Sequence, residues 1–240
     1  AADATQIMKE LKGAPQSTKV EAALILKSLK LLSFSGWTAT NTPDAATGIT
    51  RMYKKIPERG SEMRGMAKCT FDSSAERIFA MIWDCNSEDF VRLHLKHEGS
   101  KSPRLFLPVP NSHSAFTHTI RLMPSPIKNI CVESWRAWMR IKYRGKKAIA
   151  VASCPLDLYD GDDRLKDRAR IRGHDGIARA WCWTVTVIVE VAEQVCEVTH
   201  VFRTELESIT VPKIILDRKL SQQLIWVSNM QEKMQRSDQD

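Results

Sequence analysis

The stretch that decides the fold runs from residue 195 to residue 234 and reads VCEVTHVFRTELESITVPKIILDRKLSQQLIWVSNMQEKM. Its first twelve residues alternate β-branched or aromatic side chains with polar ones, and this period of two predicts a strand. A long helix then begins at Val211-Pro212, because proline is tolerated in the first turn. Apolar residues recur along this helix at steps of four and three, which places them on one face: Leu216, Leu220, Leu224, Val227, Met230 and Met234. Such a stripe must cover something apolar, either the core of a sheet or a ligand that the sheet encloses.

The chain before this stretch predicts helices near its start and mostly strands afterwards. We expect a helix over residues 18–32, a hairpin of strands 49–56 and 63–71, and a helix over 74–84 that Ser73 or Ser74 caps. Further strands are predicted over residues 114–120, 130–143, 148–154, 167–172, 180–191 and 195–206. Runs of strands followed by a helix indicate an α+β fold.

Length and composition indicate one large domain, or one domain with an extension. The 240 residues are 43% hydrophobic, which is enough for a sizeable core, and no apolar run reaches the roughly 18 residues that span a bilayer. The six cysteines form no CxxC pair and mostly fall in predicted strands, which favours buried thiols in a reducing compartment and therefore the cytoplasm. The first residues lack a signal-peptide pattern and an initiator Met, so we expect that this chain can be one domain of a larger multidomain protein.

A formal net charge of +8 raises the question of an acidic partner. The basic residues are scattered, with two short clusters over residues 140–147 and 164–172 that alternate with apolar residues or occupy loops. The simplest interpretation is a solvated face of strands and hairpins. A transient, peripheral contact with an anionic membrane surface is the better functional interpretation, and no nucleic-acid partner is expected.

The order of these elements, with five local motifs, resembles the START family of lipid-transfer domains. The motifs are Gly36-Trp37 before the first strand, SAERIFAMIWD at 74–84, RLMPSPIKN at 121–129 before the strand CVESWRAW at 131–138, Val198-Thr199 in the strand before the last helix, and ELESITVPKII at 205–215. The chain departs from the family pattern at Ile130-Cys131, where many members have an Arg-Asp pair, and at Ser208, where glycine is usual.

The resemblance implies a helix-grip fold, in which a curved antiparallel sheet wraps around the long C-terminal helix. It implies a START-like lipid-binding domain over residues 36–240, preceded by an N-terminal helical extension over residues 1–35. A tunnel between sheet and helix would hold one phospholipid or sterol-like molecule, either to transfer it between membranes or to sense it within a larger protein. The loop over residues 122–129 would lie at the tunnel mouth, with Met123, Pro126 and Ile127 as its gate and membrane contact.

Strand alternation supplies candidate tunnel walls. Over residues 135–141 one face is wholly apolar, while Trp138 shares the other face with Arg136 and Arg140. We therefore expect the apolar faces of this strand and of residues 181–189 to point inward. The predicted lining residues are Trp135, Met139, Ile141, Trp181, Trp183, Val185, Leu216, Leu220, Leu224 and Val227. The candidate polar anchors are His118, Glu133 and Lys128.

The sequence gives little support for catalysis, and we expect no enzyme, no metal and no cofactor. His94 and His97 have a spacing that a metal could use, with Glu98 nearby, but no further ligands cluster with them. The nucleophile-elbow, P-loop and dinucleotide-binding glycine motifs do not occur. Two alternatives stay open: an enzyme of the wider helix-grip superfamily that uses His118 and Glu133, and a protein-interaction module that uses the same groove.

Overall fold

The architecture was analysed in a computed structural model, which describes residues 19–39, 51–55, 62–84, 105–108, 113–121, 128–170, 177–206 and 213–237. The helices are α2 (Lys19–Leu29), η1 (Lys30–Ser33), α3 (Ala75–Trp83), η2 (Leu156–Leu158), α5 (Asp163–Ala169) and α6 (Lys213–Ser237). The strands are β1 (Thr38–Ala39), β2 (Arg51–Lys55), β3 (Glu62–Phe71), β4 (Leu105–Pro108), β5 (Ser114–Arg121), β6 (Ile130–Tyr143), β7 (Lys146–Pro155), β8 (Ala178–Ala192) and β9 (Val195–Leu206).

All of these strands join one sheet in the order β1-β2-β3-β9-β8-β7-β6-β5-β4. Every pair of neighbours in that order is antiparallel. In addition, the start of β6 pairs in parallel with the start of β8, through Ile130 with Ala178 and Cys131 with Arg179. A predominantly antiparallel sheet with a long C-terminal helix confirms the predicted α+β class.

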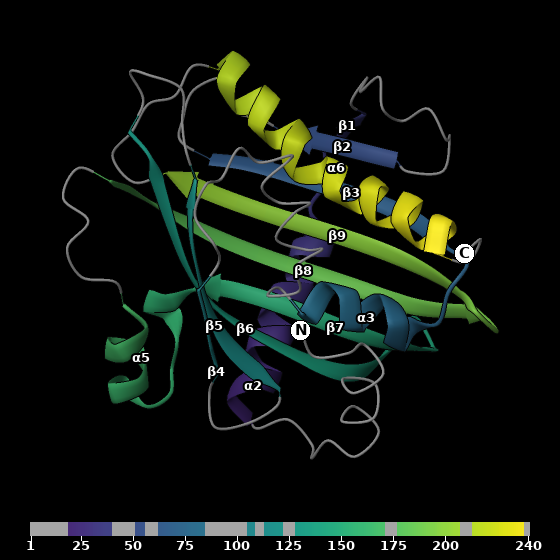
Figure 1. The fold of residues 1–240 in the computed structure, drawn as a ribbon, viewed down its shortest axis with the longest axis horizontal. Coiled ribbons are helices and arrows are strands. Elements are labelled where there is room, and N and C mark those ends of the chain that lie inside the picture. The colour runs from purple at the N-terminus through teal and green to yellow at the C-terminus, as the bar shows by residue number, and fades with distance from the viewer. Residues whose placement is uncertain are drawn as a thin grey trace.

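Helices cover the sheet on both faces (Figure 1). The C-terminal helix α6 crosses one face over β3, and α3 lies on the same face over β7 and β8. On the opposite face α2 packs on β6, β7 and β8, and η1 packs on β8 and β9. We refer to these two surfaces of the sheet as the α6 face and the α2 face. Because both are covered, the central strands bury side chains in both directions.

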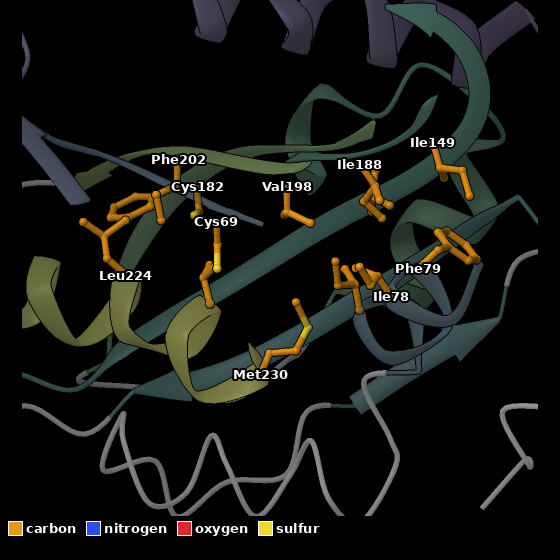
Figure 2. Packing of buried hydrophobic residues seen from close by; sticks show 14 of the residues in the cluster. Cys69, Ile78, Phe79, Ile149, Cys182, Ile188, Val198, Phe202, Leu224 and Met230 are labelled. Carbon is orange, nitrogen blue, oxygen red and sulfur yellow. The ribbon is translucent and has the colours of Figure 1, made fainter. Parts of the chain in front are cut away.

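The core on the α6 face joins α6 and α3 to the middle of the sheet (Figure 2). Leu224 of α6 lies beside Phe202 of β9, while Ile78 and Phe79 of α3 lie near Ile149 and Ile188. The α3 helix forms here because Ser74 caps it, its side chain accepting a hydrogen bond from the backbone N–H of Arg77. The predicted cap and the apolar face of this helix are therefore confirmed.

The core on the α2 face consists of two further clusters. One lies beneath α2 and η2 and includes Leu24, Ile25 and Leu156. The other lies beneath η1 and includes Leu31 with Val185 and Val201. The N-terminal helix thus packs as closely on the sheet as α6 does, although the predicted domain boundary at residue 35 stays a prediction.

One predicted strand is wrong. Residues 167–172 were expected to be extended, but α5 occupies Asp163–Ala169. Asp162 caps this helix by accepting a hydrogen bond from the backbone N–H of Arg164, at 2.8 Å. Leu165 and Ala169, four residues apart, then lie on one helical face and pack into the cluster beneath α2. A helix of two turns leaves too short a pattern for periodicity to distinguish it from a strand.

The remaining predicted helices and strands are confirmed to within a few residues wherever the structure describes them. The short strands β1 and β4 were not predicted, and the metal-like spacing of His94 and His97 lies outside the described residues. Among the helices that are described, none combines the length and the apolar character needed to cross a bilayer.

Candidate functional site

The apolar stripe of α6 faces the sheet as predicted. Leu220, Leu224 and Val227 are fully buried in the cluster on the α6 face, and Met230 and Met234 continue the stripe. Leu216 belongs to the same helix, but its side chain lies outside the described residues. Ile214, near the start of the helix, is 78% exposed, so burial is confined to one face.

The α6 face of the sheet divides into an apolar half and a half that mixes polar with apolar residues. The apolar half holds the cross-strand row Ile149, Ile188 and Val198, and α3 packs against it. Towards the other ends of these strands the same face carries hydroxyl, thiol, imidazole and guanidinium groups among apolar residues that include Phe202 and Leu206. We call the polar members of this region the polar sector: Arg136, Ser153, Cys182, Thr184, Thr186, His200 and Thr204.

His200 lies at the boundary between the two halves. Its Nδ1 is 2.8 Å from Oγ1 of Thr186, the residue directly opposite on β8. Its ring packs edge-on against Trp226 of α6, with 4.9 Å between ring centroids. Burial, followed by the positive charge of Arg136, lowers the pKa of His200 to about 3, so the imidazole is neutral at physiological pH.

The other hydroxyls of the polar sector form hydrogen bonds within it. Ser153 Oγ and Thr184 Oγ1 are 2.7 Å apart on adjacent strands. Thr204 donates its hydroxyl to the Cys182 sulfur at 3.4 Å, again directly across the ladder. Ser153, Cys182 and Thr204 are buried, and hydrogen bonds within the sector offset the cost of removing their polar groups from water.

Arg136 supplies the charge of the polar sector, and α3 positions it. Its guanidinium donates a hydrogen bond of 3.2 Å to the carbonyl oxygen of Ile82 in the last turn of α3. The same group lies over the Trp83 ring, 5.3 Å from the ring centroid. A cation near the C-terminal end of a helix is favoured by the helix dipole, and the indole adds a cation–π contact.

The predicted direction of two strands is wrong. Trp135, Met139, Ile141, Trp183 and Val185 pack on the α2 face with the clusters beneath α2 and η1, away from α6. Trp181 has the same strand parity as Trp183 and is 38% exposed. The physical reason is that alternation sets which residues share a face but not which face points inward. Here α2 and η1 cover the face that carries Trp135 and Trp183, and α6 covers the opposite one.

Trp138 accordingly points the opposite way from the prediction. It is buried on the α6 face, where its ring lies 4.8 Å from Phe79 and stacks on His113 at 4.3 Å between centroids. Its neighbour Arg140 is half exposed and pairs with Glu76 of α3 at 3.2 Å. The tryptophan therefore fixes α3 on the sheet instead of packing beside the two arginines at the surface.

The predicted polar anchors do not lie together with the polar sector. His118 and Glu133 are directly opposite one another on β5 and β6 and share the strand parity of Trp135, so they belong to the α2 face. The Nε2 atom of His118 is 3.1 Å from the Cys131 sulfur. Lys128 is exposed ahead of β6, and the predicted gate residues Met123, Pro126 and Ile127 lie outside the described residues.

The described residues contain no group of three or more potential metal ligands. The acidic loop around Asp157 has structural partners, since Asp157 pairs with Arg170 at 2.7 Å and Asp162 caps α5. The cysteines in the described strands are free and buried. Burial raises the pKa of Cys131 to about 11 and those of Cys154 and Cys196 to about 12, which keeps these three thiols protonated.

The polar sector is absent from the predicted lining, because that prediction rests on wholly apolar faces. The signal was present: on residues 180–190 the face opposite the tryptophans carries Cys182, Thr184 and Thr186 before Ile188. A face that changes from hydroxyl-bearing to apolar along one strand is typical of a surface that meets two environments. Its assembly from four strands, however, depends on cross-strand register, which the sequence does not state.

No protein-family model matches the chain, and no curated protein sequence is significantly similar to it. Solved structures of similar fold do exist. Human StAR-related lipid transfer protein 5 superposes with a TM-score of 0.61 at 12% identity, over 92% of this chain and 97% of that one. Human STARD10 gives 0.58 at 14% identity over 92% and 80%, and a STAR-related lipid transfer protein fragment from Xanthomonas axonopodis gives 0.54 at 12% over 84% and 99%. The predicted resemblance to START domains is thus confirmed at the level of the fold.

Proposed function

We propose that this chain binds a single lipid between α6 and the α6 face of the sheet, and transfers or senses it. The observation that carries the proposal is the division of this face. An amphipathic ligand needs apolar walls and a few polar groups that fix its orientation, and the α6 face offers both within one set of strands. The fold supports the same function, because the solved structures of similar fold include proteins named for lipid transfer.

The proposed role is non-enzymatic, and its mechanism is opening and closing. The helix α6 and the loop over residues 122–129 would part at a membrane, admit the lipid and close over it. The apolar stripe through Leu220 and Leu224 would then cover the apolar part of the ligand together with the sheet. Catalysis by His118 and Glu133 is disfavoured, because both belong to the α2 face and not to the face that α6 covers.

Native mass spectrometry tests this proposal directly. The purified chain is incubated with vesicles made from a total cellular lipid extract and is then separated from them. Its mass, together with that of any bound lipid, is measured under native conditions. We expect one lipid per chain. Recovery of a folded chain without lipid, with a human START domain loaded in parallel, would contradict the proposal.

Two substitutions on α6 form a matched pair for this assay. Leu224→Asp places a charge at a fully buried position and should abolish lipid retention, while Ile214→Asp places the same charge at a position that is 78% exposed and should not. Far-UV circular dichroism shows whether each variant is folded. Unchanged lipid retention by a folded Leu224→Asp chain would show that the stripe does not border the ligand.

The membrane contact is proposed at the loop over residues 122–129. Ile127→Asp and Lys128→Glu should each slow transfer between vesicles, because the loop combines apolar residues with a cation at its edge. Lys146→Glu is the matched control, since Lys146 is exposed at the start of β7, beyond the turn at the far end of β6. If the loop variants transfer lipid as fast as the control, the gate lies elsewhere. Binding to anionic vesicles should also weaken as the salt concentration rises above about 0.15 M, because the Debye length has then fallen to about 8 Å.

A further inference from the structure

We propose that His200 and Thr186 form a recognition site for a hydroxyl group, and hence that the chain selects an uncharged, hydroxyl-bearing lipid over one with a phosphate headgroup. This inference rests on the proposed function and adds the chemical class of the ligand. It concerns a pair of residues at the boundary between the apolar half and the polar sector, beneath α6.

The geometry holds the imidazole in one position. Nδ1 is engaged by Thr186 Oγ1 at 2.8 Å, and Trp226 packs edge-on against the ring. Among the described residues, Nε2 of His200 has no hydrogen-bonding partner. His200 keeps 7% of its surface accessible, and its Nε2 is not one of the fully enclosed side-chain atoms that lack a partner, so this nitrogen is within reach of a ligand or water. A ligand hydroxyl at Nε2 would complete the hydrogen bonding of the ring.

The chemistry of the pair matches a hydroxyl in both directions. A neutral imidazole has one donor and one acceptor nitrogen, and the Thr186 hydroxyl can serve Nδ1 in either role. When Thr186 donates to Nδ1, Nε2–H is the donor to the ligand, and in the other tautomer Nε2 is the acceptor. A hydroxyl group can accept or donate, whereas a phosphodiester offers acceptors only. The low pKa of His200 supports this, since the ring stays neutral and gives a phosphate no positive charge.

The surrounding charges disfavour a phosphate at this point. Recognition of phosphate usually employs bidentate arginine or several N–H donors. The neighbours of the pair across the strands are Val151 of β7 and Ala67 of β3, and the adjacent row carries the Ser153 and Thr184 hydroxyls. Arg136, the charged member of the polar sector, is held towards α3 by the Ile82 carbonyl and the Trp83 ring.

The test replaces both members of the pair with apolar residues of similar shape. In the His200→Phe/Thr186→Val double variant neither partner is left unsatisfied, which is the replacement least damaging to stability. Thr199→Val is the matched control, because Thr199 is next to His200 on β9 but has the opposite strand parity. Each chain is loaded from vesicles containing sterol, ceramide, diacylglycerol and phosphatidylcholine in equal amounts, and the extracted lipids are quantified by mass spectrometry.

We expect wild type and Thr199→Val to carry mainly the uncharged hydroxylated lipids. The double variant should lose about tenfold in the ratio of these lipids to phosphatidylcholine, as the loss of a buried hydrogen bond implies. The inference is overturned if the wild type prefers phosphatidylcholine, or if the folded double variant keeps the wild-type ratio. A wild-type chain that carries no lipid at all would instead refute the proposed function, so the two failures are distinguishable. If the double variant does not fold, His200→Phe alone also removes Nε2 and gives the comparison.

Discussion

Replacing Gly65 with alanine should destabilise the protein through one identified contact. Gly65 lies directly opposite Phe202 in the β3–β9 ladder. A Cβ atom on Gly65 would lie 2.5 Å from Cε1 and 2.7 Å from Cζ of Phe202, and 3.2 Å from Cδ2 of Leu224. The aromatic ring thus covers the glycine across the strands, and Leu224 of α6 closes over both. Alanine would push the ring into the helix.

Two opposing effects set the change in the free energy of unfolding that Gly65→Ala causes. Gly65 is in a strand and does not have a positive φ, so alanine is compatible with the backbone and would by itself stabilise by about 0.4–1 kcal/mol. Overpacking against the ring costs about 1–3 kcal/mol. In the wild-type background we therefore expect a net loss of about 1–2 kcal/mol. In a Phe202→Leu background the atoms that would collide are absent, and the same change should be neutral or stabilising.

A double-mutant cycle measured by urea unfolding tests this reasoning. The four chains are the wild type, Gly65→Ala, Phe202→Leu and the double variant, each followed by far-UV circular dichroism. The expected coupling is about 2 kcal/mol, which exceeds the usual non-additivity of distant sites. Two results would refute the reasoning: a Gly65→Ala chain more stable than the wild type, or an equal penalty in both backgrounds. Either would mean that the ring does not lie over the glycine.

Three further predictions concern a helix cap, a buried imidazole and the thiols. Ser74→Ala removes the cap of α3 and should lower the free energy of unfolding by about 1 kcal/mol, whereas Ser74→Asp should retain most of it. Because His200 is protonated more readily when unfolded than when folded, its contribution to stability is complete above pH 6.5 and is lost as pH falls towards 3. Denaturation across that range should show a weaker pH dependence for His200→Phe, and identical profiles would contradict the assigned burial. Cys131, Cys154 and Cys196 should react slowly with a disulfide reagent at pH 8 while folded and rapidly in denaturant.

Local features could be predicted from the sequence because their causes are local. The Ser74 cap, the strands through residues 130–143 and 195–206, and the stripe of α6 each follow from spacing along one segment. The helix α5 could not, because two turns leave too little periodicity and its side chains are fixed by packing beneath α2. The candidate site is predicted against α6, but the structure turns the predicted residues of the sheet away from that helix.

The sequence by itself determined which side chains share a face of each strand, and it determined that α6 buries one stripe. Only the tertiary structure decided which face each strand turns towards α6. The face with Trp135 and Trp183 packs beneath α2 and η1, and the face with Thr186 and His200 lies beneath α6. The physical reason is that alternation along a strand is the same whichever of its two faces turns towards α6. The helices on the two faces of the sheet make two different environments, and only their packing selects between them. Register then brings hydroxyls from β7, β8 and β9 together, and no single segment contains that arrangement.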